Sequence, residues 1–242
     1  MPAILILAAG VGKRLMPLTG AVPKSLVDVG DGRTLLDCQM GALAECGLRR
    51  VRFVLGYRSD QIEKELRRYR DFQFEIVYNP FFRVADNLVS AWLGLRSMRG
   101  HVLLINGDNL FFSREIVETL VGSTGEVTMA IRRKEDYDSD DMKVVTRNGF
   151  VVDVGKNIDP EAADAESMGI ISFRGGGLNS MWDSLDSMVR SEENLKLFYL
   201  AALRRLIKDG RPVHASECTA HSCDEIDHIE DLAGVRSMRG TA

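Results

Sequence analysis

The N-terminal stretch of the chain, AILILAAGVGKRLMPLTGAVPKSL, is the feature that most constrains the fold. Residues 4–7 form a short apolar run of Ile and Leu, of the length expected for a buried parallel strand. Small residues follow this run, at Ala8, Ala9, Gly10 and Gly12. Three cations come next, at Lys13, Arg14 and Lys24. A strand that ends in a glycine-rich turn, with backbone N–H groups and cations beside it, is typical of a phosphate-binding loop.

Two well-known phosphate-binding loops are excluded by the residues around Gly12. A Walker A loop has Ser or Thr directly after Gly-Lys, whereas Arg14 follows Gly12 and Lys13 here. The dinucleotide-binding motif needs a third glycine near position 15, which is Leu15. The loop therefore indicates another class of phosphate-binding protein.

The composition is ordinary for a soluble globular protein. The chain has 242 residues, of which 45% are hydrophobic and 27% charged, and its net charge is −4. Because the chain is acidic, we expect neither nucleic acid nor an anionic membrane as its main partner. The first apolar run has no basic flank and is too short to span a bilayer. We therefore predict a cytoplasmic protein without a signal peptide or membrane anchor.

The first half of the chain alternates between strand and helix patterns. We predict strands over residues 4–7, 51–55, 74–78, 101–105 and 127–131, and helices over 34–47, 60–69, 88–97 and 113–121. Asp60 and Glu63 have the spacing of a capping box, and Ser113 can cap the last of these helices. The alternation predicts an α/β, Rossmann-like fold with a mostly parallel sheet, helices on both faces, and ligands at the carboxyl ends of the strands.

The second half of the chain has a different pattern. Asn148 and Gly149 separate two strand-like runs, 142–146 and 150–154, which predicts a β-hairpin. We further predict strands over 169–173 and 212–216, and helices over 178–190, 195–208 and 229–238. No linker, repeat or low-complexity tract interrupts the sequence, so we expect one domain over residues 1–242.

Two acidic residues stand where carboxylates can act. Asp108 follows Asn106 and Gly107 at the end of a predicted strand, and Asp227 precedes the last predicted helix in the segment Asp-Glu-Ile-Asp. Each acidic segment taken alone fits a helix cap or a solvated edge.

The N-terminal stretch resembles the signature of the nucleotidyltransferases, LAAGxGxRL…P.T…PK. The matching positions are Leu7, Ala8, Ala9, Gly10, Gly12, Arg14, Leu15, Pro17, Thr19, Pro23 and Lys24. The same resemblance implies that Asp108 and Asp227 bind Mg²⁺. It also implies the nucleotidyltransferase fold, in which residues 1–132 form a nucleotide-binding core and residues 133–242 form an acceptor-binding part with a small β-hairpin lid and a closing helix.

Two further blocks resemble the phosphocholine and phosphonate cytidylyltransferases within this family. The first contains Asn79, Asn87 and Ser90, which could read a pyrimidine or ribose, although Asp86 stands where the family has a paired Asn. The second runs from residue 141 to 170. It implies Lys156 as a clamp on the acceptor phosphate or phosphonate. Weaker acceptor contacts are expected at Lys143, Glu166, Arg132 and Arg133.

The resemblance implies a Mg²⁺-dependent cytidylyltransferase that uses CTP and a small phosphonate or phosphate, with release of pyrophosphate. Lys13 and Arg14 would hold the β- and γ-phosphates, Lys24 the α-phosphate, and Asn106 would line the nucleotide site. Because residues 221–224 contain no aromatic carbocycle, we expect an uncaged acceptor of the phosphonoformate, hydroxyethylphosphonate or aminoethylphosphonate type. Phosphocholine cytidylyltransferase, sugar-1-phosphate nucleotidyltransferase and non-catalytic nucleotide sensor remain alternatives, and the oligomeric state is not predicted.

Overall fold

The computed structural model describes residues 1–219 and 222–240. Nine strands form the main sheet: β1 (Ala3–Ala8), β2 (Arg50–Leu55), β3 (Gln73–Tyr78), β4 (Val102–Asn106), β6 (Val127–Arg132), β7 (Lys143–Arg147), β8 (Phe150–Gly155), β9 (Ala165–Phe173) and β10 (His214–Glu217). A second sheet contains β5 (Asn109–Phe111) and β11 (Cys223–Glu225). The helices are α1 (Leu18–Ala21), α2 (Leu35–Glu45), α3 (Ser59–Leu66), α4 (Asn87–Leu95), α5 (Glu115–Gly122), α6 (Gly175–Met188), α7 (Leu200–Lys208) and α8 (Ile229–Gly240). Among these described helices, none is long and apolar enough to cross a membrane.

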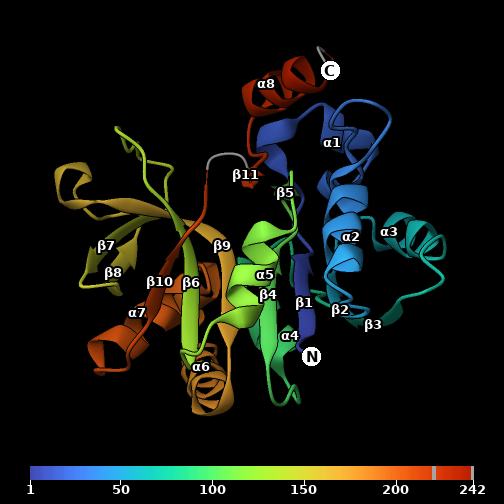
Figure 1. Ribbon diagram of the computed structural model, residues 1–242. Coiled ribbons are helices and arrows are strands. Elements are labelled where there is room, and N and C mark those ends of the chain that lie inside the picture. The colour runs from blue at the N-terminus through green and yellow to red at the C-terminus, as the bar shows by residue number, and fades with distance from the viewer. Residues whose placement is uncertain (220–221, 241–242) are drawn as a thin grey trace.

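The main sheet has the strand order β3-β2-β1-β4-β9-β6-β10-β8-β7 (Figure 1). The strands from β3 to β4 are parallel, and β10 is parallel to β6. In contrast, β9 lies antiparallel between β4 and β6, and the hairpin β7–β8 forms the far edge. The predicted α/β class and the predicted hairpin are therefore both present. Asn148 and Gly149 have φ values of 52° and 80°, the left-handed conformation that a tight hairpin turn needs.

Apolar side chains alternate along β1 and divide the core between the two faces of the sheet. Leu5 and Leu7 belong to a cluster with α4, α6 and α7. Ile4 and Ile6 belong to a second cluster with α2, α3 and α5. Because successive residues of a strand point to opposite faces, a strand covered on both sides must be apolar throughout. The continuous apolar run at residues 4–7 is thus explained.

A third, smaller apolar cluster holds the N-terminal loop against the C-terminal helix. Leu15 and Val27 of the loop are buried with Leu232 and Val235 of α8, and Ile226 belongs to the same cluster. Figure 1 shows α8 and α1 near one another, although they lie at opposite ends of the sequence. This packing positions the segment that carries Asp227 over the phosphate-loop region.

The start of α3 differs from the prediction. Asp60 and Glu63 do not form a capping box, because α3 starts at Ser59 after Arg58, which has φ of 48° and gives no side-chain cap. The capping box is instead at α2, where the Thr34 hydroxyl accepts a hydrogen bond from the Asp37 N–H at 3.1 Å and the Asp37 carboxylate accepts one from the Thr34 N–H at 2.8 Å.

Two other predicted helices also differ. Ser113 lies one residue before Arg114, the N-cap of α5, but its hydroxyl still accepts a hydrogen bond from the Glu115 N–H at 3.4 Å. The predicted helix 195–208 is shorter than expected, because α7 begins only at Leu200. The carbonyl groups of Leu195 and Leu197 accept hydrogen bonds from the backbone N–H groups of Asp86 and Leu88 at 2.8 and 3.3 Å. These two carbonyls therefore bind the start of α4 and hold the segment outside α7.

Candidate active site

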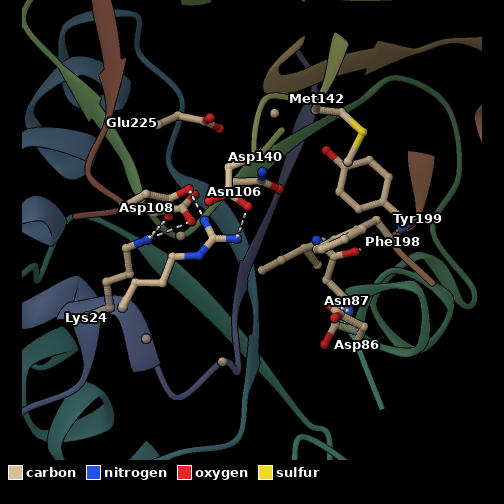
Figure 2. A pocket seen from close by; sticks show the side chains of 18 of the residues that line it. Lys24, Asp86, Asn87, Asn106, Asp108, Asp140, Met142, Phe198, Tyr199 and Glu225 are labelled. Atoms are coloured by element: carbon tan, nitrogen blue, oxygen red, sulfur yellow. Dashed lines mark hydrogen bonds and ion pairs between the residues drawn. The ribbon is translucent and has the colours of Figure 1, made fainter. Parts of the chain in front are cut away.

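A cavity of about 770 Å³ opens at the carboxyl ends of β1 and β4, where the strand order predicts a ligand. It is lined by most of the residues that the sequence singled out: Leu7, Ala8, Ala9, Gly10, Gly12, Lys13, Arg14, Lys24, Asn79, Asn87, Ser90, Asn106, Asp108, Arg132, Lys156, Glu166 and Asp227. Lys143 and Arg133 do not lie on its wall. Figure 2 shows Lys24 and Asp108 on one side of the cavity and Phe198 on the other.

Gly12 closes the glycine-rich loop onto Lys24. Its φ of 67° lies in the left-handed region, and a Cβ atom there would lie 3.1 Å from Thr19 Cγ2 and 3.2 Å from Lys24 Cβ. The Thr19 hydroxyl donates a hydrogen bond of 2.8 Å to the Gly12 carbonyl. The loop thus depends on glycine at this position, and its fold determines where the stem of Lys24 lies.

Lys24 joins the two carboxylates that the sequence assigned to a metal. Its ammonium lies 2.9 Å from Asp108 Oδ2 and 2.6 Å from Asp227 Oδ1, and its side chain is 13% exposed. Burial lowers the pKa of Lys24, but the two carboxylates more than offset this and raise it above its ordinary value. Burial likewise opposes ionisation of Asp227, yet Lys24 and Arg14 hold the pKa of that carboxyl below its usual range. The side chains of Lys24 and Asp227 are therefore both charged at neutral pH.

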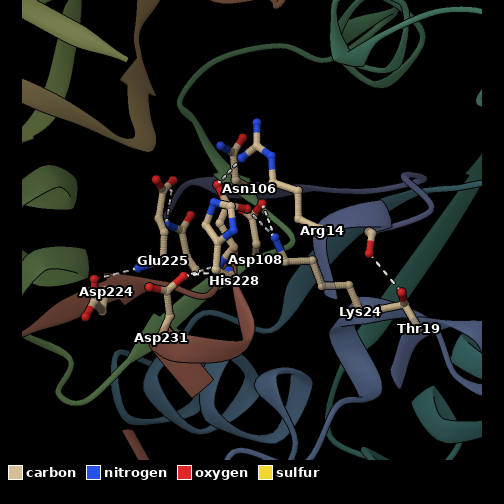
Figure 3. Close-up of polar contacts among 12 residues, drawn as sticks. Arg14, Thr19, Lys24, Asn106, Asp108, Asp224, Glu225, His228 and Asp231 are labelled. Carbon is tan, nitrogen blue, oxygen red and sulfur yellow. Dashed lines mark hydrogen bonds and ion pairs between the residues drawn. The ribbon is translucent and has the colours of Figure 1, made fainter. Parts of the chain in front are cut away.

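The small second sheet brings Asp227 to Asp108. β11 pairs antiparallel with β5, so that Glu225 lies opposite Asn109, and the Ile226 N–H donates to the Asp108 carbonyl at 3.2 Å. Asp231 Oδ2 accepts hydrogen bonds from the backbone N–H groups of Asp227 and His228, at 2.8 and 2.6 Å (Figure 3). These contacts at the start of α8 fix the turn from which Asp227 points into the cavity.

Charges of alternating sign continue from this centre across the cavity. Arg14 Nη1 lies 2.9 Å from Asp227 Oδ2, and Arg14 Nη2 lies 3.6 Å from Asp140 Oδ1. The same Asp140 oxygen lies 3.5 Å from Lys156 Nζ, which in turn lies 5.0 Å from the centre of the Phe198 ring. The phosphate-loop cations and the predicted acceptor clamp are thus joined in one line of charge, which we call the charge line (Asp108, Lys24, Asp227, Arg14, Asp140 and Lys156).

The residues predicted to read the pyrimidine form hydrogen bonds with other protein groups at the wall of the cavity. Asn79 is 1% exposed, and its amide donates to the Ser90 hydroxyl at 2.9 Å while its oxygen accepts from the Phe81 N–H at 2.9 Å. The Asn87 oxygen accepts from the Tyr199 N–H at 2.8 Å. Asp86, which departs from the family pattern, is the N-cap of α4. Their side chains thus shape the wall at least as much as they offer groups to a ligand.

The basic residues from the end of β6 to the start of β7 have partners within the protein. Arg132 binds Glu166 and Asp224, at 2.7 and 2.8 Å, and Lys134 binds Asp141 and Glu166, at 2.7 and 3.0 Å. Arg133 lies away from the cavity with Asp164 and Glu217. Lys143 is 1% exposed and donates to the Asp138 carbonyl at 2.6 Å. Arg133 and Lys143 therefore do not reach the cavity, whereas Arg132 lines it as part of a network of ion pairs.

Phe198, Tyr199 and Glu225 also line the cavity, and none of them was assigned a role from the sequence. Phe198 and Tyr199 line the cavity beside Lys156, so aromatic rings do reach this region, from a segment remote from residues 222–224. Position 221 lies outside the described residues. Glu225 also lines the wall, and burial, with the charges of Asp108 and Asp227, raises the pKa of its carboxyl. The acidic segment marked Glu225 in sequence, but no local pattern places Phe198 or Tyr199 here.

The oxygen atoms near Lys24 fit a hard cation. Asp108 Oδ1 and Asn106 Oδ1 are buried, and neither has a hydrogen-bond partner among the described residues. In the same described ranges, no group of three or more His, Cys, Asp or Glu side chains forms a ready-made metal site. A ligand set of two carboxylates completed by substrate phosphates and water is the arrangement that Mg²⁺ commonly takes. Asp108, with its unpartnered Oδ1, and Asp227, on the other side of Lys24, are the residues that would hold it.

Comparison with known proteins agrees with this architecture. The family model described as a MobA-like NTP transferase domain matches residues 4–240. The CTP:phosphoglutamine cytidylyltransferase of Campylobacter jejuni is 24% identical, with 94% of this chain and 96% of that protein aligned. The choline-phosphate cytidylyltransferase of Streptococcus pneumoniae is 25% identical, with 94% and 93% aligned. The solved structure of CTP:phosphocholine cytidylyltransferase from Streptococcus pneumoniae superposes with a TM-score of 0.84 at 24% identity over 98% of each chain. The predicted nucleotidyltransferase fold is confirmed.

Proposed function

The chain belongs to the MobA-like NTP transferase domain family, and from this premise we propose that it is a Mg²⁺-dependent cytidylyltransferase. It transfers CMP from CTP to a small phosphate or phosphonate acceptor and releases pyrophosphate. The two cytidylyltransferase relatives are named for phosphoglutamine and choline phosphate, which supports CTP as donor and a phosphorylated acceptor.

The observation that carries this proposal is the charge line across the cavity. Nucleotidyl transfer brings a triphosphate and an anionic acceptor together, so its main barrier is charge repulsion and misorientation. Cations reach the cavity from the nucleotide side, at Arg14 and Lys24, and from the opposite hairpin, at Lys156. Such an arrangement can bind both anions at once and hold them in line.

The reaction then needs no covalent intermediate on the protein. An oxygen of the acceptor attacks the α-phosphorus of CTP, the bond to the β-phosphate oxygen breaks, and pyrophosphate takes that electron pair. Lys24 orients the α-phosphate, Lys13 and Arg14 hold the departing phosphates, and Lys156 holds the acceptor. Mg²⁺ held by Asp108 and Asp227 would neutralise phosphate charge and lower the barrier to attack.

The ion-pair network around Arg132 and Lys134, which forms one wall of the cavity, favours an acceptor with a cationic end. In the paired network, two cations, Arg132 and Lys134, face three carboxylates: Asp141, Glu166 and Asp224. Their sum is one excess negative charge, which attracts an amine and repels a carboxylate such as that of phosphonoformate. Among the phosphonates considered, the aminoethylphosphonate type therefore fits best. Because Phe198 and Tyr199 also line the wall, phosphocholine is the competitor to test against it.

The experiment is a pyrophosphate-release assay with each of the four nucleoside triphosphates and a panel of acceptors. We expect CTP to be used, activity to require Mg²⁺ and to stop on chelation, and aminoethylphosphonate to exceed phosphonoformate in kcat/KM. The panel includes phosphocholine, hydroxyethylphosphonate and a sugar 1-phosphate, with Asp108→Asn as the inactive control. Preference for UTP or dTTP with the sugar 1-phosphate would contradict the proposal. CTP binding without turnover of any acceptor would indicate a nucleotide sensor instead.

A further inference from the structure

Asp140 occupies a position that the proposed reaction does not use. It lies in the loop between β6 and β7 and lines the cavity opposite the glycine-rich loop. One of its oxygens contacts both Arg14 Nη2, at 3.6 Å, and Lys156 Nζ, at 3.5 Å. The two cationic nitrogens therefore lie within about 7 Å of each other, the upper limit set by these two contacts. Figure 2 shows Asp140 near the middle of the cavity.

The contacts of Asp140 are weak compared with those at the other end of the charge line. Its side chain is 55% exposed, and both contacts are too long for hydrogen bonds. The ammonium of Lys24, in contrast, is hydrogen-bonded at 2.6 and 2.9 Å and its side chain is only 13% exposed. Exposed ion pairs contribute little stability, so a phosphate group can replace the Asp140 carboxylate at low cost.

We propose that Asp140 is a built-in substitute for a substrate phosphate. In the free protein its carboxylate stands between Arg14 and Lys156, holds both cations in the cavity and keeps them from ambient anions. Substrate phosphates displace it when they bind. This inference rests on the proposed role of Arg14 and Lys156 as phosphate contacts. It makes Asp140 a positioning residue that also competes with the ligand.

The loop around Asp140 is built to present that carboxylate. Asp138 Oδ1 accepts hydrogen bonds from the N–H groups of Asp140 and Asp141, at 2.7 and 3.0 Å. The buried Lys143 holds the base of this turn by donating to the Asp138 carbonyl at 2.6 Å. Asp136, in the same loop, is exposed and forms no ion pair with Arg14 or Lys156, which pair with Asp140 instead. Asp136→Asn therefore removes the same charge from the same loop without touching the contact.

The test is calorimetric binding of inorganic pyrophosphate in EDTA, and of CTP with Mg²⁺, to the full chain. We expect Asp140→Asn to bind pyrophosphate about two- to fivefold more tightly than the wild type, the size of an exposed ion-pair contribution. Asp136→Asn should bind like the wild type. In a Lys156→Gln background the gain from Asp140→Asn should shrink, because one of its two partners is gone.

Weaker pyrophosphate binding by Asp140→Asn, or a change equal to that of Asp136→Asn, would overturn the inference. The inference would also be overturned if Asp140→Asn tightened pyrophosphate binding as much in the Lys156→Gln background as in the wild type. Asp140 would then act only through its general negative charge. If the wild type binds pyrophosphate but not CTP, the proposed function fails, whereas the role of Asp140 is still decided by the pyrophosphate comparison. If the wild type binds neither, both are wrong.

Discussion

The two ends of the charge line differ in how firmly they are built. At the nucleotide end, Lys24 is buried between Asp108 and Asp227, with contacts of 2.6 to 2.9 Å. At the acceptor end, Lys156 is held by one contact of 3.5 Å to an exposed carboxylate and by the face of Phe198. For the proposed reaction, this difference predicts a preorganised site for the triphosphate and an adaptable site for the acceptor.

The sheet explains this difference. The nucleotide end rests on β1 and β4, which are covered on both faces and whose central residues, such as Ile6 and Leu104, are fully buried. The acceptor end rests on the edge hairpin β7–β8, where Phe150 and Val152 are 38% and 39% exposed. A central strand confines its terminal loop more strongly than an edge hairpin does, so substitutions at the two ends should differ in size.

The largest expected effect is at the firmly built end. Asp108→Asn and Asp227→Asn should each lower kcat at least about a hundredfold, roughly 2.7 kcal/mol, because the charge that would hold Mg²⁺ is removed. Circular dichroism should be unchanged, and the melting temperature should fall only modestly, because Lys24 keeps its ion pair with the remaining carboxylate. The exposed Asp71→Asn is the matched control for a lost carboxylate. A variant that keeps a tenth of the wild-type activity would remove that residue from the proposed metal site.

The next largest effect should come from Gly12→Ala. The left-handed φ and the approach of the new Cβ to Lys24 should cost about 1–2 kcal/mol of folding free energy and lower kcat/KM about tenfold. Gly41→Ala is the control, because its Cβ meets no atom within 4 Å and α2 should gain about 1 kcal/mol. Steady-state kinetics and chemical denaturation measure both. If Gly12→Ala were as active as the wild type, the loop would be less firmly built than we infer.

Arg14→Ala and Lys156→Ala compare the two ends directly. Arg14→Ala should weaken CTP binding and impair all acceptors alike, because Arg14 lies against Asp227 at the nucleotide end. Lys156→Ala should lower kcat/KM for the acceptor by about tenfold and leave CTP affinity nearly unchanged. Calorimetry with CTP, together with kinetics on two acceptors, separates these outcomes. Equal losses of CTP affinity in both variants would contradict the division into two ends.

The smallest effect concerns the seam between the parallel strands and β9. His101 Nε2 and Ser172 Oγ lie 2.8 Å apart across this seam, and burial, with Arg174 and the N-terminal amine, lowers the pKa of His101 to about 4. The unfolded chain therefore binds the proton more readily than the folded protein does. The folding stability that the neutral His101 contributes is fully present above about pH 6.5 and is lost as the pH falls toward 4.

Because the ring is partly exposed, we expect a loss of only about 1 kcal/mol. Between pH 6.5 and 4 the melting temperature of the wild type should fall further than that of His101→Gln, which cannot titrate there. An equal fall of the melting temperature with pH in the two proteins would show that His101 has no role in the pH dependence of stability. A steeper fall in the variant would mean that the sign of the pKa shift is wrong.

The sequence alone determined the features whose causes are local. The apolar run at residues 4–7, Gly12 in its left-handed turn, and the Asn148–Gly149 turn each follow from what a few neighbouring residues can adopt. Lys24 and Asp108 could be assigned to one site because loops after parallel strands meet at the same edge of the sheet.

Tertiary structure alone decided the features that depend on distant partners. No local pattern shows that β11 pairs with β5 and brings Asp227 to Asp108. Nor does one show that Arg132 is occupied by Glu166 and Asp224, or that Phe198 faces Lys156. The sequence does not show whether the partner of a charged side chain is a substrate or a carboxylate about ninety residues away, as in the pair of Arg132 and Asp224. Only the packing of the elements fixes which of these it meets, because ion pairs act over a few ångströms in space and not along the chain.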